Sequence, residues 1–208
     1  MPAEAEFSRR IGLIVGGASG IGREAALLLA RRGAHLVVAD FDEAGARKVA
    51  EQAGALASPE FVSFTGVDLV SVHSLAAAVG KTILEFGGLD FIVNTAAIYP
   101  LPGPDGELSE GLWAKTFVVN VTGNYFLANS VHWALEDQKL AASLVLTGSA
   151  NASRPRDPVA GKIQNFLFAR RVRRRPPKQA RGFLCAADIA QAAHYTRSLC
   201  CGYRVALG

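Results

Sequence analysis

The 208-residue chain is 50% hydrophobic and contains 21 glycines, which is enough to bury the core of one α/β domain. Its four histidines and three cysteines (Cys185, Cys200 and Cys201) give neither a disulfide framework nor a metal-ligand spacing, and no apolar run reaches membrane-spanning length. The N-terminal stretch MPAEAEFSRR lacks the apolar region of a signal peptide, so with a net charge of +4 we expect a cytoplasmic protein without a metal or a membrane contact.

The first elements that the sequence predicts are a buried strand, a glycine-rich turn and a helix. The apolar run Ile11–Val15 predicts the strand, and apolar positions recur at helical spacing from Ile21 until Arg31, Arg32 and Gly33 predict the helix end. Glycines between them allow the backbone to turn sharply and to approach a pyrophosphate, which the free N–H groups of the helix would bind. The candidate cofactor-binding residues of this turn are Gly16, Ser19, Gly20, Ile21 and Gly22.

A second strand, Leu36–Ala39, ends in Asp40, 18 residues after Gly22. A carboxylate there can accept hydrogen bonds from the ribose hydroxyls of an adenosine and would repel a 2′-phosphate, which favours NAD over NADP. The alternative is a tight turn with no ligand. The strand before the turn, the helix after it and the acid at the end of the second strand together favour the nucleotide site.

The glycine spacing, Gly-x-x-x-Gly-x-Gly, resembles that of the classical short-chain dehydrogenase/reductase family. The resemblance implies an α/β fold: a Rossmann-like, doubly wound parallel sheet with helices on both faces. It also implies NAD-dependent hydride transfer between a small-molecule alcohol and a ketone.

The next elements lead to a candidate adenine site. Residues 42–53 predict a helix that Gly54 closes, and Phe61–Thr65 alternates as a strand. By resemblance, Asp68 and Leu69 bind the adenine ring. The alternative is that Asp68 caps the helix predicted over residues 71–86, which Gly87 and Gly88 terminate.

The strand predicted over residues 89–93 leads into Asn94-Thr95-Ala96-Ala97. The family has an aspartate, three apolar residues and Asn-Asn-Ala-Gly here, so Asp90 and Asn94 match whereas Thr95 and Ala97 depart. The resemblance implies that Asn94 ties neighbouring strands together and that Asn94 and Ala96 lie in the cofactor site. Ala97 places a methyl group beside the expected path of the nicotinamide ribose.

Two further candidates are catalytic by resemblance. Asn120 lies in helical sequence that runs from Ser109 to about Lys139. In the family, the matching asparagine distorts the helix and holds a water in the proton path. Its alternative is a core amide with internal partners. Ser149 follows the strand predicted over residues 143–147 and matches the serine that hydrogen-bonds the reacting carbonyl; its alternative is a serine that caps a turn.

The family's Tyr-x-x-x-Lys pair has no counterpart in this sequence. The resemblance implies that the tyrosine shuttles the proton and that the lysine lowers its pKa. No tyrosine occurs between Tyr125 and Tyr195; Lys162 is one candidate for the lysine, and Tyr195 is interpreted as a packing aromatic. We therefore expect weak or absent turnover.

The charge balance changes near residue 153. Residues 1–153 carry 10 Lys/Arg and 16 Asp/Glu, whereas residues 154–208 carry 12 and 2. The five arginines of residues 170–175, followed by two prolines, are incompatible with the buried sixth strand expected there. We therefore expect an NAD-binding domain over residues 1–153 and an atypical basic segment over residues 154–208, either part of the same domain or partly disordered, so that the C-terminal part of the fold is incomplete.

Three interpretations of function follow. The chain is an NAD-dependent oxidoreductase, a non-catalytic NAD-binding regulatory module, or an aberrant (spliced or frameshifted) product with a basic tail that binds nucleic acid. Residues 170–181 lack interleaved aromatic residues, which favours a solvated charge run without a nucleic-acid partner. Because the family assembles partly through the helical region 109–139, we expect a weak homodimer or a monomer.

Overall fold

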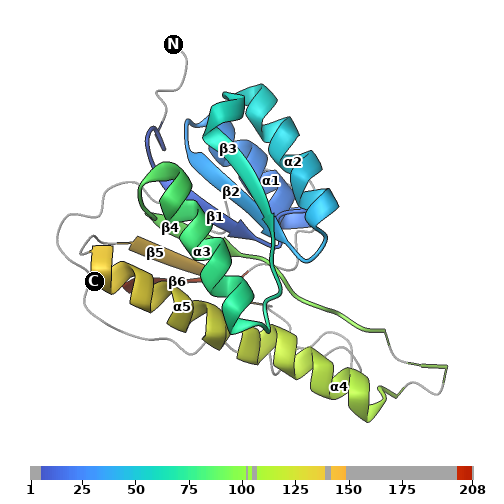
Figure 1. Cartoon of the computed structure of the whole chain (residues 1–208). Helices are drawn as coiled ribbons and strands as arrows, with labels where there is room; N and C mark the ends of the chain where they lie inside the picture. Colours follow the sequence, from blue (N-terminus) through green and yellow to red (C-terminus); the bar gives the residue numbers. More distant parts are fainter. Residues whose placement is uncertain (1–5, 102, 105–106, 139–141, 149–200, 208) are drawn as a thin grey trace.

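The computed structural model describes residues 6–101, 103–104, 107–138, 142–148 and 201–207. Its sheet has the strand order β3-β2-β1-β4-β5-β6, in which the first five strands are parallel and β6 is antiparallel to β5 (Figure 1). The strands are β1 (Ile11–Val15), β2 (His35–Asp40), β3 (Val62–Gly66), β4 (Phe91–Asn94), β5 (Ala142–Gly148) and β6 (Cys201–Leu207). The chain order reverses direction between β1 and β4, which is the arrangement of a doubly wound sheet.

Helices cover both faces of the sheet (Figure 1). One face packs against α1 (Gly20–Arg31) and α2 (Glu43–Leu56), and the other against α3 (Val72–Phe86) and α5 (Gly123–Gln138). A short helix, α4 (Glu110–Phe117), continues through the π-helix η2 (Val118–Thr122) into α5 and extends beyond the sheet. The 3₁₀ turn η1 (Pro59–Phe61) precedes β3. The predicted Rossmann-like α/β fold is confirmed.

Alternation along the central strands explains why both faces need a helical cover. In β1, Leu13 and Val15 point into the core shared with α3 and α5, whereas Ile14 points into the core shared with α1 and α2. All three side chains are fully buried. Successive side chains of a strand point to opposite faces, so a strand that is apolar at every position must be covered on both sides.

Two elements differ from the sequence prediction. Gly54 does not close α2, which runs on to Leu56. Gly54 instead packs closely on Pro59, whose Cα would lie 3.0 Å from a Cβ at this position. Strand β6 was not predicted; it places residues 201–207 in the sheet beside β5. Residues 170–181, with their arginines, lie outside the described residues, and the predicted division at residue 153 stays a prediction.

The amino-terminal edge of the sheet is closed by side chains that bond to backbone groups. The carboxylate of Asp90 accepts hydrogen bonds from the Ile11 N–H at 2.9 Å and from the Arg10 guanidinium at 2.8 Å. Gln138, in the last turn of α5, accepts from the Leu89 N–H and donates to the Leu89 carbonyl at 2.8 and 3.1 Å. These bonds fix the amino-terminal ends of β1 and β4. The glycine turn lies at the opposite, carboxyl ends of the strands.

Candidate cofactor site

The glycine turn is held against β2 and β4 at the carboxyl edge of the sheet. The N–H groups of Gly16 and Gly17 donate to the Ala39 carbonyl at 2.8 and 3.1 Å. Gly16 has φ +81°, a left-handed conformation that strongly favours glycine. A Cβ at Gly22 would lie 2.1 Å from the Gly16 carbonyl oxygen and 2.5 Å from Oγ1 of Thr95. Gly16 and Gly22 are therefore required by packing within the turn itself.

The N-terminus of α1 follows the glycine turn directly. Ser19 is the N-cap in extended conformation, and within the described turn its side chain makes no capping hydrogen bond and no acidic residue lies in the first helical turn. Gly20 has φ +52°, and a Cβ there would meet nothing within 4 Å, so open space lies in front of it. The structure thus brings Ser19, Gly20 and Ile21 to an uncapped helix end, which is suited to an anion.

Asp40 lies at the same edge, at the end of β2. Its carboxylate accepts the Ala18 N–H of the glycine turn at 2.9 Å and the Asp42 N–H at 3.0 Å. A carboxylate offers about four acceptor positions, so two bonds leave capacity for ribose hydroxyls. Because Asp40 bonds directly to the turn, its charge is held beside the helix end.

Asp68 and Leu69 follow β3, next to β2 at the same edge. Oδ1 of Asp68 accepts the Val70 N–H at 3.0 Å, and the side chain of Ser71, not of Asp68, caps α3. Leu69 is buried and packs against α5, because a Cβ at Gly123 would lie 2.6 Å from its Cγ. Asp68 therefore shapes the turn, and its adenine role stays a prediction.

Asn94, Thr95 and Ala96 join β4 to the turn. Asn94 is buried; its Oδ1 accepts the Ala96 N–H at 3.0 Å, and its carbonyl accepts Oγ1–H of Thr147 in β5 at 2.9 Å. The Thr95 N–H donates to the Val15 carbonyl at 2.8 Å, and its hydroxyl shares one proton between the carbonyls of Val15 and Gly16 at 3.2 and 3.0 Å. The bond to β5 uses the backbone carbonyl of Asn94, so the implied roles of the Asn94 side chain in joining strands and in the cofactor site stay predictions.

Asn120 lies in the π-helix η2 and is buried. Its Oδ1 accepts the Ile98 N–H at 2.9 Å, and its Nδ2 donates to the Ile98 carbonyl at 2.8 Å. The helix is distorted at this residue, and the side-chain amide is satisfied by the segment that follows β4. The described contacts therefore match the core-amide alternative, and the role of Asn120 in a proton path stays a prediction.

Two residues of the site were missed by the sequence reasoning. Thr95 counted only as a departure from the family pattern, although it bonds to the turn from β4. Asn124 links Asn94 to Asn120: it accepts from Nδ2 of Asn94 and donates to the Asn120 carbonyl, both at 2.7 Å. The spacing of Asn120 and Asn124, four residues apart in helical sequence, is a signal that could have shown the contact.

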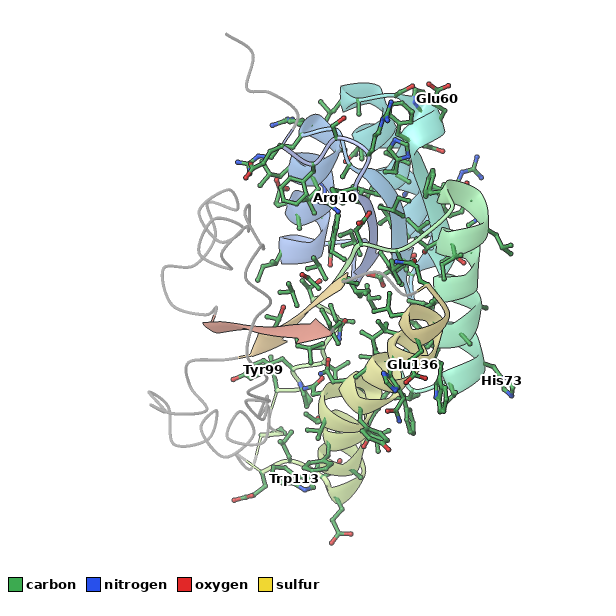
Figure 2. The ribbon with its side chains drawn as sticks, turned by 90° about the vertical axis from the view of Figure 1, so that its left-hand side faces the viewer. Arg10, Glu60, His73, Tyr99, Trp113 and Glu136 are labelled. Carbon is green, nitrogen blue, oxygen red and sulfur yellow. The ribbon has the colours of Figure 1, made fainter. Side chains whose placement is uncertain are left out.

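The candidate Ser149 lies outside the described residues, as do Lys162 and Tyr195. Leu146 pairs with Asn94, the last residue of β4, and β5 continues two residues farther to Gly148. Tyr99, which follows the segment held by Asn120, is 49% exposed and lies on the α4 side of the molecule, away from Arg10 and Glu60 (Figure 2). Among the described residues, no group of three or more His, Cys, Asp or Glu could hold a metal ion.

The geometry of the turn agrees with the comparison to known families. The model of the short chain dehydrogenase family matches residues 10–160, which is most of the chain. The chain belongs to this family. Members of this family are oxidoreductases that bind nicotinamide cofactors. The glycine turn, Asp40 and β4 all lie within the matched residues.

Two curated relatives and one solved structure show the range of the similarity. The chain is 34% identical over 157 residues to a short chain dehydrogenase/reductase, astE, of Aspergillus oryzae, covering 74% of this chain and 59% of the relative. It is 34% identical over 146 residues to a 2,5-dichloro-2,5-cyclohexadiene-1,4-diol dehydrogenase of Sphingobium indicum, covering 70% and 56%. A glucose/ribitol-type short-chain dehydrogenase/reductase from Brucella melitensis superposes with a TM-score of 0.64 at 28% identity, covering 78% and 67%.

The chain thus spans less than two thirds of the length of these curated relatives. In the part of the chain that the structure describes, no helix is both long enough and apolar enough to cross a membrane.

The packing at Gly22 predicts a strong effect of a single methyl group. Gly22→Ala would drive Cβ into the Gly16 carbonyl, which belongs to rigid backbone, so we expect a loss of roughly 2–4 kcal/mol in the free energy of unfolding. Urea unfolding followed by circular dichroism measures it.

Gly80 provides the matched control, because it lies inside α3 and a Cβ there would meet nothing within 4 Å. Gly80→Ala should raise the free energy of unfolding by about 0.5–1 kcal/mol, the usual gain from replacing glycine within a helix. Equal stability of the Gly22→Ala protein and the parent would contradict the packing of the turn.

Proposed function

We propose that the chain binds NAD(H) at the carboxyl edge of the sheet and, as a family member, acts on an alcohol/ketone pair. The observation that supports the cofactor choice is Asp40, a carboxylate bonded to the Ala18 N–H beside the uncapped N-terminus of α1. A pyrophosphate fits the helix end, and a 2′-phosphate beside Asp40 would be repelled. We also propose a cytoplasmic location, because the spacing of the three cysteines is not that of a disulfide framework.

The topology suggests how the dinucleotide lies. In a doubly wound sheet the ligand crosses the switch point, here between β1 and β4, so the adenosine lies over β2 and the nicotinamide over β4. Asp40 would then hold the adenosine ribose, with Asp68 and Leu69 beside the adenine. Gly16, Ser19, Gly20, Ile21 and Gly22 would face the pyrophosphate, and Asn94 and Ala96 would support the nicotinamide ribose.

The chemical step needs a hydride and a proton. The nicotinamide, when bound, supplies or accepts the hydride. Ser149 would hydrogen-bond the reacting oxygen, and Asn120 would support the proton path. Because the sequence has no tyrosine between Tyr125 and Tyr195, the developing alkoxide lacks the family's proton donor. The substrate is proposed to be a small-molecule alcohol or ketone, as the name of the Sphingobium relative, a diol dehydrogenase, suggests.

Cofactor preference tests the proposal directly. Asp40→Asn keeps an acceptor oxygen for the Ala18 N–H, but it removes the charge and the second acceptor, which the Asp42 N–H uses. We expect its Kd for NADH to rise about tenfold, since hydrogen bonds to a charged group are worth roughly 1.5–3 kcal/mol, and its Kd for NADPH to fall. Quenching of tryptophan emission or isothermal titration calorimetry measures both.

Asp42→Asn is the control. Asp42 is the N-cap of α2, where asparagine serves as well as aspartate, so this variant removes a neighbouring charge while keeping the cap. It should leave both Kd values unchanged. An Asp40→Asn protein with the parent's NADH and NADPH affinities would contradict the assignment of Asp40.

Turnover is expected to be slow. Loss of general acid–base catalysis alone lowers a rate by about 10²–10⁴-fold, so kcat with NAD⁺ and a panel of secondary alcohols should lie far below the roughly 10 s⁻¹ of a typical enzyme. The appearance of NADH absorbance measures it, with Ser149→Ala as control. A kcat of ordinary size would contradict the expected loss of acid–base catalysis. Saturable NADH binding without any turnover would favour the non-catalytic NAD-binding module.

We also propose a weak homodimer through residues 109–139. Tyr125 and Trp133 of α5 are 63% and 69% exposed, which is unusual for large aromatic side chains. Glutamate at both positions should convert a dimer to a monomer in light scattering. Leu84→Glu is the control, because Leu84 is 89% exposed but lies on α3, and a stable tetramer would contradict the proposal.

A further inference from the structure

Three asparagines link the end of β4 to η2 and α5 through side-chain hydrogen bonds and one backbone carbonyl. Nδ2 of Asn94 donates to Oδ1 of Asn124, and Nδ2 of Asn124 donates to the carbonyl of Asn120, each at 2.7 Å. The side chain of Asn120 then binds both backbone groups of Ile98. Asn94 and Asn120 are buried and Asn124 is partly buried, so water has limited access to these bonds.

Asn124 makes two of these hydrogen bonds, and one of them goes to the π-helix η2. In η2 the Gly123 N–H bonds to the Val118 carbonyl, five residues earlier, so the helical ladder is out of its usual register there. The Asn120 carbonyl receives a side-chain donor from Asn124. A side chain that bonds back to the carbonyl four residues earlier often accompanies a bent helix.

We infer that Asn124 is a positioning residue for the nicotinamide half of the site, an inference that rests on the proposed NAD(H) function. Through Asn120 it sets the position of Ile98, and through Asn94, whose Oδ1 holds the Ala96 N–H, it sets the segment that follows β4. That segment lies on the β4 side of the switch point, where the nicotinamide would lie. Asp40, on the β2 side, bonds to the turn without any contact to Asn124 among the described hydrogen bonds.

Two variants separate the bonds that Asn124 makes. Asn124→Leu has similar volume and makes neither bond. Asn124→Asp keeps an acceptor for Nδ2 of Asn94 but cannot donate to the Asn120 carbonyl. Gln138→Leu is the matched control, because Gln138 lies on the same helix and bonds backbone groups of Leu89 at the opposite edge of the sheet.

The readout compares NADH with ADP-ribose, which has the adenosine and pyrophosphate but no nicotinamide. We expect both Asn124 variants to raise the Kd for NADH about tenfold, equal to a loss of about 1.4 kcal/mol, and to change the Kd for ADP-ribose less than about twofold. Gln138→Leu should lower Tm and leave the ratio of the two Kd values unchanged. Equal weakening of both ligands, or an unchanged ratio in the Asn124 variants, would overturn the inference.

Hydrogen exchange tests Asn124 independently of any ligand. The amide proton of Ile98 should exchange about tenfold faster in both Asn124 variants than in Gln138→Leu, because its acceptor on Asn120 would lose its fixed position. Unchanged exchange at Ile98 would overturn the inference. If the parent protein binds neither NADH nor ADP-ribose, the proposed function fails, and the exchange at Ile98 still decides whether Asn124 positions this segment.

Discussion

The site depends on the close contact between the glycine turn and the ends of β2 and β4. The Ala39 carbonyl accepts two N–H groups of the turn, Asp40 accepts a third, and the Thr95 hydroxyl bonds to the carbonyls at the other side. Each of these groups would be an unpaired polar group at a partly buried position if the turn moved. The bonds therefore hold the N-terminus of α1 in one place and leave its first N–H groups free for a ligand.

This contact explains how the chain tolerates its departure from the family pattern at residue 95. Threonine places a hydroxyl donor where the carbonyls of Val15 and Gly16 need one, and its Oγ1 lies within van der Waals reach of Gly22. The departure at Ala97 differs, because Ala97 is exposed and its methyl side chain makes no hydrogen bond to the glycine turn. The first departure is accommodated by the fold, whereas the second lies where a ligand would pass.

On the β4 side of β1, the hydrogen bonds of Asn94, Asn124 and Asn120 likewise hold elements that meet at the carboxyl ends of the strands. Apolar packing of a helix on a sheet is non-directional, so hydrogen bonds define the position of the helix more sharply. The bonds from Asn94 through Asn124 to Asn120 and Ile98 specify that position with directional contacts. The β2 side and the β4 side of the glycine turn are thus held by separate sets of hydrogen bonds.

The sequence by itself determined the strand–turn–helix pattern and the acid at the end of β2. These follow from local periodicity and from glycine at positions where no side chain fits. Only the tertiary structure decided that Thr95 bonds to the turn, that Ser71 rather than Asp68 caps α3, that residues 201–207 pair antiparallel with β5, and that Asn124 joins Asn94 to Asn120. Such contacts join atoms that are distant along the chain, and a side-chain amide or hydroxyl has several possible partners until the packing of the helices on the sheet selects one.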